Sequence, residues 1–174
     1  MTYSKPVLGF AAFSGTGKTT LLTQLIPLLA DRGVQVGVIK HAHHNFDIDK
    51  PGKDSYELRK AGARQMLVAS RKRWALMTET DDSDDPQLDD LIGRLDLEKV
   101  DLVLVEGFKH VPFTRIELHR PSLGHPLLYP EDNNIIAVAT DSPIDTGGLP
   151  RLDLNDVGAI VEFVMNWTNE QARI

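Results

Sequence analysis

The fold is decided by a stretch near the start of the chain, Ala12-Phe13-Ser14-Gly15-Thr16-Gly17-Lys18-Thr19-Thr20. An apolar segment precedes it, and a segment with the apolar spacing of a helix follows it. A strand, a glycine-rich turn, a Lys-Thr pair and a helix in this order form the context of a phosphate-binding P-loop. The glycines allow backbone N–H groups to close on a phosphate, and the helix that begins there directs the positive end of its dipole at the anion.

Each residue type within this stretch has a predicted role in binding a nucleotide. Lys18 is expected to contact the β- and γ-phosphates, and the hydroxyl of Thr19 is expected to reach Mg²⁺. The other phosphate contacts are expected from Ser14, Gly15, Thr16, Gly17 and Thr20. Ala12 stands where the G-x-x-x-x-G-K-S/T pattern has its first glycine. Because alanine does not adopt positive φ cheaply, we expect an ordinary β-type backbone at this position.

The composition is that of an ordinary soluble globular protein. With 174 residues, 41% hydrophobic and 25% charged, the chain is long enough for one domain and a small elaboration. A formal net charge of −6 does not indicate binding to nucleic acid or to an anionic membrane. The absence of cysteine excludes disulfides and thiolate metal sites. Since no signal peptide or membrane-spanning run is recognisable, we expect a cytoplasmic protein.

Apolar segments with the character of buried strands alternate with helical patterns along most of the chain. The buried strands are expected at residues 7–13, 34–39, 100–105 and 134–139. This alternation predicts an α/β fold with a mainly parallel sheet and helices on both faces. Two apolar segments at residues 63–80 flank a basic turn and interrupt the alternation. They predict an inserted β-hairpin, an antiparallel extension of a single P-loop domain that spans residues 1–174.

Local signals predict further details of the elements. Residues 115–119 alternate between polar and apolar types, which predicts a half-exposed strand with the character of a sheet edge. The caps of three helices are expected at Asp54 (with Glu57 as its partner in a capping box), at Asp85, and at Asn155 or Asp153.

Two acidic residues flank the predicted strand at 100–105, but only one of them lies at its carboxyl end. Ligands of open α/β sheets bind at the carboxyl ends of the strands, where the P-loop also lies. Asp101 and Glu106 are separated by about 16 Å, at ~3.3 Å per residue, so they cannot bind the same ion. We therefore expect Glu106 to act with Thr19 on Mg²⁺ or to orient water, and we assign the catalytic roles to Lys18 and Glu106.

A polar segment with many titratable groups, residues 40–55, follows the predicted strand at 34–39. Contacts to phosphate, to Mg²⁺-bound water or to a second ligand are expected from Lys40, His41, Asp49, Asp54 and Lys109. The histidines of this segment, His41, His43 and His44, also suggest a divalent-metal site. The adjacent positions of His43 and His44 disfavour this alternative, because an extended backbone points neighbouring side chains to opposite sides.

A candidate for base recognition, Asp141, follows the last predicted core strand. In many P-loop GTPases an aspartate after a late strand accepts the N1 and N2 protons of guanine, usually within the sequence N/T-K-x-D. No lysine precedes Asp141 here. The residues alone therefore favour GTP over ATP only weakly, and the choice of base stays open.

Four blocks of the sequence together resemble a known family. They are Phe13-Ser14-Gly15-Thr16-Gly17-Lys18-Thr19-Thr20-Leu21; Val38-Ile39-Lys40-His41-Ala42-His43-His44; Asp49 with Gly52-Lys53-Asp54-Ser55 and Ala61-Gly62-Ala63; and Asp101-Leu102-Val103-Leu104-Val105-Glu106-Gly107-Phe108-Lys109. With these blocks the chain resembles the molybdopterin-guanine dinucleotide biosynthesis adaptor proteins, the MobB family. The P-loop is common to many families, whereas the second block, combined with Gly-Lys-Asp-Ser and Glu-Gly-Phe-Lys, is specific.

The resemblance implies a GTP-binding protein with weak GTPase activity that forms a homodimer. It also implies that the protein assists the molybdenum cofactor guanylyltransferase, which joins GMP to molybdopterin, so a molybdopterin-type ligand is expected near the site. Expected cofactors are GTP and Mg²⁺, and no nucleic-acid or membrane partner is expected. The dimer would be compatible with edge pairing by the hairpin at 63–80 and by the strand at 115–119.

Two other functional classes use the same motif. A small-molecule P-loop kinase would need Asp49 or Asp54 as a base, and lid arginines from Arg71, Arg73, Arg115 or Arg120. A metal-delivery GTPase would use the segment with His41, His43 and His44. For the adaptor GTPase slow hydrolysis is expected, since no glutamine is evidently placed to orient water.

Overall fold

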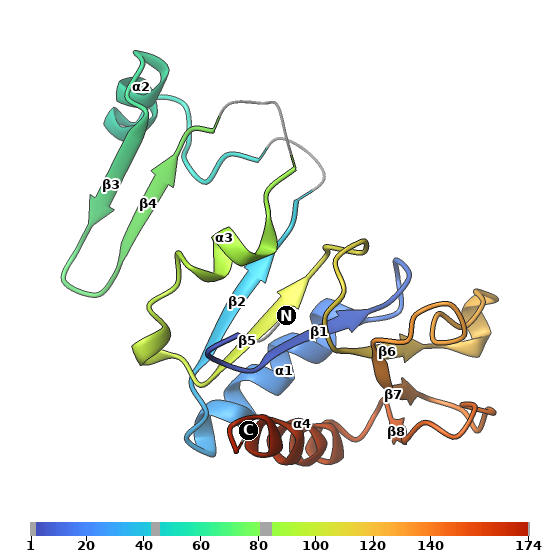
Figure 1. Ribbon diagram of the computed structural model, residues 1–174. Helices are drawn as coiled ribbons and strands as arrows, with labels where there is room; N and C mark the ends of the chain where they lie inside the picture. Colours follow the sequence, from blue (N-terminus) through green and yellow to red (C-terminus); the bar gives the residue numbers. More distant parts are fainter. Residues whose placement is uncertain (1–2, 43–45, 81–84, 174) are drawn as a thin grey trace. The chain divides into compact units, whose positions relative to one another are not determined.

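The structure is a computed structural model that describes residues 3–42, 46–80 and 85–173. The chain forms two compact units, one made of Met1–His41 and Gln87–Ile174 and the other of Ala42–Pro86. The first unit contains the P-loop and a large sheet (Figure 1). The second unit contains the predicted hairpin and extends over the segments on both sides of it.

The sheet of the first unit has six strands, and each pair of neighbouring strands in it is parallel. In spatial order the strands are β2 (Val36–Lys40), β5 (Leu102–Glu106), β1 (Val7–Ala11), β6 (Arg115–His119), β7 (Ile135–Thr140) and β8 (Arg151–Asp153). The parallel sheet and the four predicted core strands are confirmed. The short strand β8 was not predicted, because two of its three residues are charged and its apolar signal is correspondingly weak.

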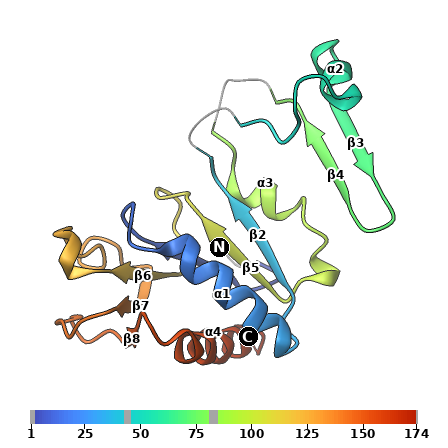
Figure 2. The ribbon, with the colours of Figure 1, turned by 180° about the vertical axis from the view of Figure 1, so that it is seen from behind.

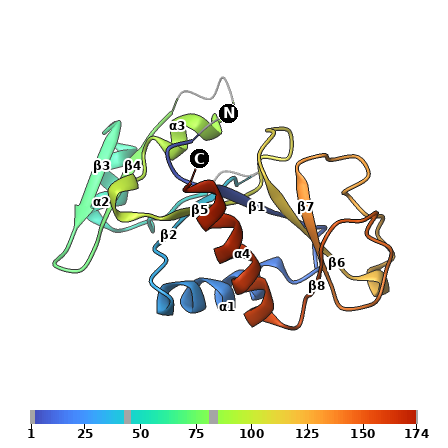
Figure 3. The same cartoon turned by 60° about the horizontal axis from the view of Figure 1, so that its bottom comes forward.

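Helices cover both faces of this sheet, as predicted. The helices are α1 (Lys18–Asp31), α3 (Leu88–Ile92) and α4 (Val157–Gln171), with two 3₁₀ turns at η1 (Leu97–Lys99) and η2 (Pro121–Leu123). Helices α1 and α4 lie side by side on one face (Figures 2 and 3) and share a core with Leu102 and Leu104 of β5. Helix α3 covers the other face, where it contacts the core that contains Val103 and Val105. Alternate residues of a strand thus serve opposite cores, as the pleat requires.

Strand β6 corrects one expectation. The alternation at residues 115–119 predicted a half-exposed strand with edge character, but β6 lies inside the sheet between β1 and β7. Its polar residues Arg115, Glu117 and His119 are all buried. The carboxylate of Glu117 accepts hydrogen bonds from the backbone N–H groups of Leu128 and Tyr129, at 2.8 and 2.9 Å. The polar face of β6 is therefore covered by the loop that follows it and not by water.

Arg115 is held by a set of partners that compensates for its burial. Its guanidinium donates to the carboxylate of Asp132 at 2.9 Å and to the backbone carbonyl oxygens of Phe108 and Val111. Burial by itself would raise the pKa of the Asp132 carboxyl group. Hydrogen bonds from the Asn134 amides, together with Arg115, outweigh burial and hold that pKa below its usual range.

Two of the predicted helix caps are wrong in the first unit. Helix α3 begins at Leu88 with Gln87 at the cap position, so Asp85 does not cap it. Helix α4 is capped by Asp156, whose side chain accepts a hydrogen bond from the backbone N–H of Ala159 at 2.9 Å. Several acidic or amide residues precede each helix, and the final register of the first turn selects among them.

The second unit consists of α2 (Asp54–Lys60) and a two-stranded antiparallel sheet of β3 (Gln65–Ala69) and β4 (Trp74–Thr78). The predicted hairpin is confirmed. The predicted capping box is wrong, because Lys53 is at the cap position and the carboxylate of Glu57 accepts from the backbone N–H of Gly52. Large apolar side chains are exposed on this unit, namely Phe46, Ile48, Leu58, Leu67, Val68, Trp74 and Leu76.

Within the described ranges, none of the helices combines the length and the apolar character needed to cross a bilayer.

Candidate functional site

The P-loop has the backbone geometry that its sequence predicts. Gly15 and Gly17 have φ of +82° and +100°, and Gly17 is the residue that caps helix α1. Between them, Thr16 is buried, and its hydroxyl donates a hydrogen bond to the backbone oxygen of Phe13 at 2.8 Å. Phe108 is the one described non-glycine residue with positive φ, so Ala12 keeps an ordinary backbone as expected. The hydroxyl of Thr16 thus holds the loop closed on the backbone of Phe13.

The carboxylate of Glu106 lies beside the P-loop lysine. The Nζ atom of Lys18 is 3.4 Å from one carboxylate oxygen of Glu106, and the Nζ atom of Lys40 is 3.5 Å from the other. Strand β5 lies between β1 and β2, with Lys40 directly opposite Glu106 in the β2–β5 register. The parallel order of the strands thus brings together three residues that sequence reasoning had placed at one edge. The set carries two positive charges and one negative charge.

The turn after Glu106 is held in a rare conformation. Gly107 has φ of +95° and Phe108 has φ of +53°. A Cβ atom on Gly107 would lie 2.7 Å from the Cβ atom of His41, so only glycine fits there without displacement. The backbone N–H of His41 donates to the backbone oxygen of Glu106 at 2.9 Å, and its ring stacks on Phe108. His41 therefore fixes the position of Glu106 through the backbone.

Arg120 connects the P-loop to the predicted base-recognition residue. It directly follows β6, and its Nε–H donates to the backbone oxygen of Thr16 at 2.9 Å. The Nη1 group of the same side chain forms an ion pair with the carboxylate of Asp141, at the end of β7. Sequence reasoning considered Arg120 only as a lid residue. Its position directly after a strand at the ligand-bearing edge is the signal that could have identified it.

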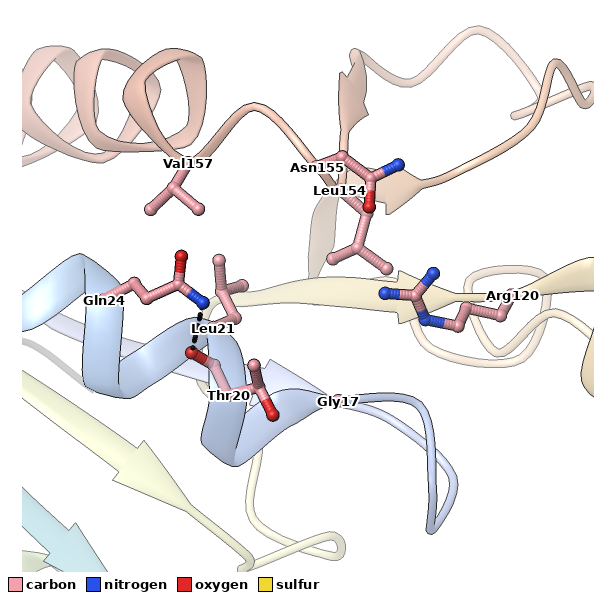
Figure 4. A pocket seen from close by; sticks show the side chains of 8 residues that line it. All are labelled: Gly17, Thr20, Leu21, Gln24, Arg120, Leu154, Asn155 and Val157. Carbon is pink, nitrogen blue, oxygen red and sulfur yellow. Dashed lines mark hydrogen bonds between the residues drawn. The ribbon is translucent and has the colours of Figure 1, made fainter.

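A pocket of about 170 Å³ lies next to the P-loop, on the side of β8 and α4 (Figure 4). It is lined by Gly17, Thr20, Leu21, Gln24, Arg120, Leu154, Asn155 and Val157. Figure 4 shows that these side chains come from the first two turns of α1, from the end of β6 and from the connection between β8 and α4. All of them belong to the first unit.

The other predicted site residues are placed as follows. Ser14, Thr19 and Thr20 are exposed on and after the P-loop, and Lys109 is exposed beyond Phe108. Asp49 and Asp54 belong to the second unit, where Asp54 is the first residue of α2. His43 and His44 lie outside the described residues. Among the residues that the structure describes, no group of three or more His, Cys, Asp or Glu is arranged to hold a metal ion.

Comparison with known proteins decides the family. Residues 7–141 match the family model described as molybdopterin guanine dinucleotide synthesis protein B. The chain belongs to this family. The matched range contains the P-loop, the turn after Glu106, Arg120 and Asp141, and the predicted MobB family membership is thereby confirmed.

Relatives within the MobB family match almost the whole chain. The molybdopterin-guanine dinucleotide biosynthesis adapter protein of Escherichia coli (strain K12) is 54% identical over 167 residues, which is 95% of each chain. The protein of the same name from Haemophilus influenzae is 47% identical over 163 residues, or 93% of this chain and 89% of the relative. The similarity therefore extends beyond the P-loop into the second unit and helix α4.

Solved structures of the MobB family have the same fold. A crystal structure of molybdopterin-guanine biosynthesis protein B has a TM-score of 0.73 at 28% identity and covers 94% of this chain and 99% of its own. The structure of Bacillus subtilis MobB has a TM-score of 0.70 at 22% identity, over 92% and 96% of the two chains. The predicted α/β fold is thus confirmed by structural comparison.

Proposed function

We propose that this chain is an adapter of molybdopterin guanine dinucleotide biosynthesis that binds GTP at its P-loop and hydrolyses it slowly. The observation that carries the nucleotide-binding part is the arrangement of Lys18 and Glu106 beside a P-loop with two left-handed glycines. The adapter part is supported by family membership and by the names of the Escherichia coli and Haemophilus influenzae relatives.

The phosphates would bind where the backbone of residues 14–20 meets the start of α1. Ser14, Gly15 and Thr16 would offer backbone N–H groups, and Lys18 would exchange its partner Glu106 for the phosphates. Lys18 and Glu106 are each about one-fifth exposed, so this exchange needs no rearrangement of the core. Lys40 and Lys109 would add positive charge at the same edge.

Mg²⁺ fits the donor set of this site. The hydroxyl of Thr19 and the carboxylate of Glu106 are the hard oxygen ligands that Mg²⁺ prefers. Thr19 directly follows Lys18 in the sequence, and the carboxylate of Glu106 is 3.4 Å from the Nζ atom of Lys18. When bound, the ion would supply neutralisation of phosphate charge. The contacts of Glu106 with the ammonium groups of Lys18 and Lys40 support the placement of its carboxylate beside the bound phosphates.

Slow hydrolysis follows from the residues at the site. The sequence has no glutamine in residues 12–20, 40–46 or 106–110, so no side chain of the type that orients attacking water is supplied there. A partner protein or a second protomer could supply it. The proposed partner is the molybdenum cofactor guanylyltransferase, with a cytoplasmic homodimer as the acting species and a molybdopterin-type compound as the second ligand.

Calorimetry with Mg²⁺, comparing GTP and ATP, tests nucleotide binding, and Lys18→Ala is the variant. We expect the variant to lose at least tenfold in GTP affinity, about 1.4 kcal/mol, while its circular dichroism is unchanged. The matched control is Lys5→Ala, which removes the same charge from the segment before β1. A smaller loss than this would refute the phosphate assignment.

The adapter role is tested by adding the protein to a purified guanylyltransferase and measuring formation of the guanine dinucleotide. We expect the wild-type chain to raise the yield and Lys18→Ala to raise it less. Transfer of the γ-phosphate to a small-molecule hydroxyl, and not to water, would favour the kinase alternative. That alternative already loses one lid candidate, because Arg115 is buried and held by Asp132.

A further inference from the structure

The pocket beside α1 is continuous with the predicted phosphate site. Gly17 caps α1 and Lys18 begins it, while Thr20, Leu21 and Gln24 line the pocket along the next turns. At 1.5 Å per residue, Gln24 is about 10 Å along the helix axis from Gly17. A group attached to phosphates at the start of α1 would therefore lie in or over this pocket.

The size of the pocket restricts what it can hold. Its volume of about 170 Å³ corresponds to roughly five or six water molecules at about 30 Å³ each. Pockets for whole drug-sized ligands are larger, roughly 300–1,000 Å³. The pocket fits one part of a nucleotide and not a second complete ligand.

The walls of the pocket suit a flat heteroaromatic ring. Leu21 and Leu154 are buried side chains that offer apolar surface, and Val157 adds to it from the start of α4. Polar groups make up the larger part of the lining, among them Arg120 and the exposed Asn155 (Figure 4). The pocket thus combines an apolar patch, on which a ring can stack, with polar groups that can hydrogen-bond to the edge of a nucleobase.

The guanidinium of Arg120 has one group, Nη2, that can donate hydrogen bonds into the pocket. Its Nε–H is used by the backbone oxygen of Thr16, and its Nη1 is used by Asp141. Within the described residues, Nη2 has no hydrogen-bond partner, and it lies 3.8 Å from where a Cβ atom on Gly17 would be. Figure 4 shows the guanidinium directed at the space between the first turn of α1 and Leu154.

The donors of Arg120 distinguish guanine from adenine. Guanine presents the acceptor O6, to which the Nη2 group of Arg120 can donate, whereas adenine presents an N6 amino donor in place of O6. Asp141, next to Arg120, is an acceptor for the N1 and N2 protons of guanine. The amides of Asn155 and Gln24 each carry a donor and an acceptor, so they serve both purines and do not decide between them.

We propose that this pocket is the nucleobase subsite, that it takes guanine, and that Arg120 with Asp141 determines the preference. The proposal rests on the proposed binding of GTP, and it adds where the base lies and which residues read it. Arg120 contacts both the Thr16 carbonyl of the P-loop and the base-recognition carboxylate, so it is the residue shared by the two halves of the nucleotide site.

The test compares GDP, ADP and inorganic triphosphate by calorimetry with Mg²⁺ on the full chain. Arg120→Gln is expected to lower the preference for GDP over ADP by roughly 10- to 150-fold, the range for one hydrogen bond from a charged group. Its affinity for inorganic triphosphate should stay within about threefold of wild type. The matched control is Arg151→Gln, which removes an exposed arginine from β8 and should change no affinity.

A second variant tests the pocket itself without touching the P-loop. Asn155→Trp at the exposed rim should weaken GDP and ADP together by at least tenfold and leave inorganic triphosphate unaffected; Asn169→Trp near the end of α4 is the control. An unchanged GDP affinity in Asn155→Trp would overturn the proposal. So would equal losses of GDP and inorganic triphosphate in Arg120→Gln, because Arg120 would then only support the P-loop.

Failure of the underlying GTP proposal has a different signature. If Lys18→Ala kept both GDP and inorganic triphosphate affinity, the phosphate site would be wrong, whatever the pocket variants did. If Lys18→Ala abolished binding while wild type bound GDP and ADP equally, the phosphate site would stand and the guanine subsite would be refuted.

Discussion

Replacing Glu106 by glutamine should change nucleotide affinity in opposite directions with and without Mg²⁺. The carboxylate lies 3.4 Å from the Nζ atom of Lys18 and 3.5 Å from that of Lys40, so it competes with phosphate for both cations. Without Mg²⁺, the substitution removes this competitor, and affinity for GDP should rise. With Mg²⁺, the substitution removes a charged oxygen ligand, and affinity should fall.

The magnitude follows from the shorter ion pair. Two unit charges 3.4 Å apart interact by about 1.2 kcal/mol at the dielectric constant of water and by about 5 kcal/mol at an effective value of 20. Both side chains of the Lys18–Glu106 pair are about one-fifth exposed, and partly exposed pairs contribute near the lower limit. We expect a gain of ~1–1.5 kcal/mol without Mg²⁺, or about five- to tenfold in GDP affinity.

Calorimetric titration of GDP in EDTA and in Mg²⁺ measures the affinity under both conditions. The control is Glu162→Gln, which changes the same charge on α4, where Glu162 pairs with Arg32 at the surface. That control should change the GDP affinity in neither buffer. A Glu106→Gln variant that loses affinity in EDTA, or that changes equally in both buffers, would show that Glu106 neither competes with phosphate nor serves the ion.

Two further predictions concern the scaffold of the site. Asp132→Asn should lower the free energy of unfolding by about 2–3 kcal/mol in urea, because it leaves the buried guanidinium of Arg115 with two carbonyls and no counter-charge. Because the pKa of Asp132 is lowered in the folded state, its carboxylate contributes to stability above the pKa of the unfolded chain and loses this contribution as pH falls through the folded-state pKa. The unfolding free energies of wild type and variant should therefore converge as pH falls below about 4. A difference that stays constant with pH would refute the assignment. Gly107→Ala should cost about 2–4 kcal/mol, from positive φ and from contact with His41, whereas Gly124→Ala, with φ of +67° and open space around it, should cost only about 1–2 kcal/mol. Equal losses in the two glycine variants would contradict the role assigned to the His41 contact.

The features predicted correctly from the sequence depend on a local pattern or on the rule that parallel strands end at the same edge of a sheet. The P-loop is a local pattern, so its glycine conformations and the start of α1 followed from the nine residues 12–20. The position of Glu106 beside Lys18 required only that parallel strands end at the same edge. Both the spacing of Asp101 from Glu106 and the partner of Asp101, the backbone N–H of Gln35 at the far end of β5, agree with that rule.

What the sequence did not predict depends on contacts between distant segments. The alternation in β6 has the same appearance whether the polar face meets water or meets a loop that supplies Asp132 and two backbone N–H groups. The contact of Arg120 with the P-loop spans 104 positions in the chain. No window of the sequence contains both ends of such a contact, so periodicity and spacing could not reveal it.

The pairing of Glu106 with two lysines has a consequence for the protein before it meets a nucleotide. The carboxylate of Glu106 occupies the place of an anion between Lys18 and Lys40, so it offsets one of their two positive charges. Inorganic phosphate carries few charges, so it gains little binding energy by displacing Glu106 from the two lysines. A triphosphate carries more charge and makes more contacts, so it can displace Glu106. Among the many small anions of a cell, Glu106 would thus make the site selective for ligands of high negative charge.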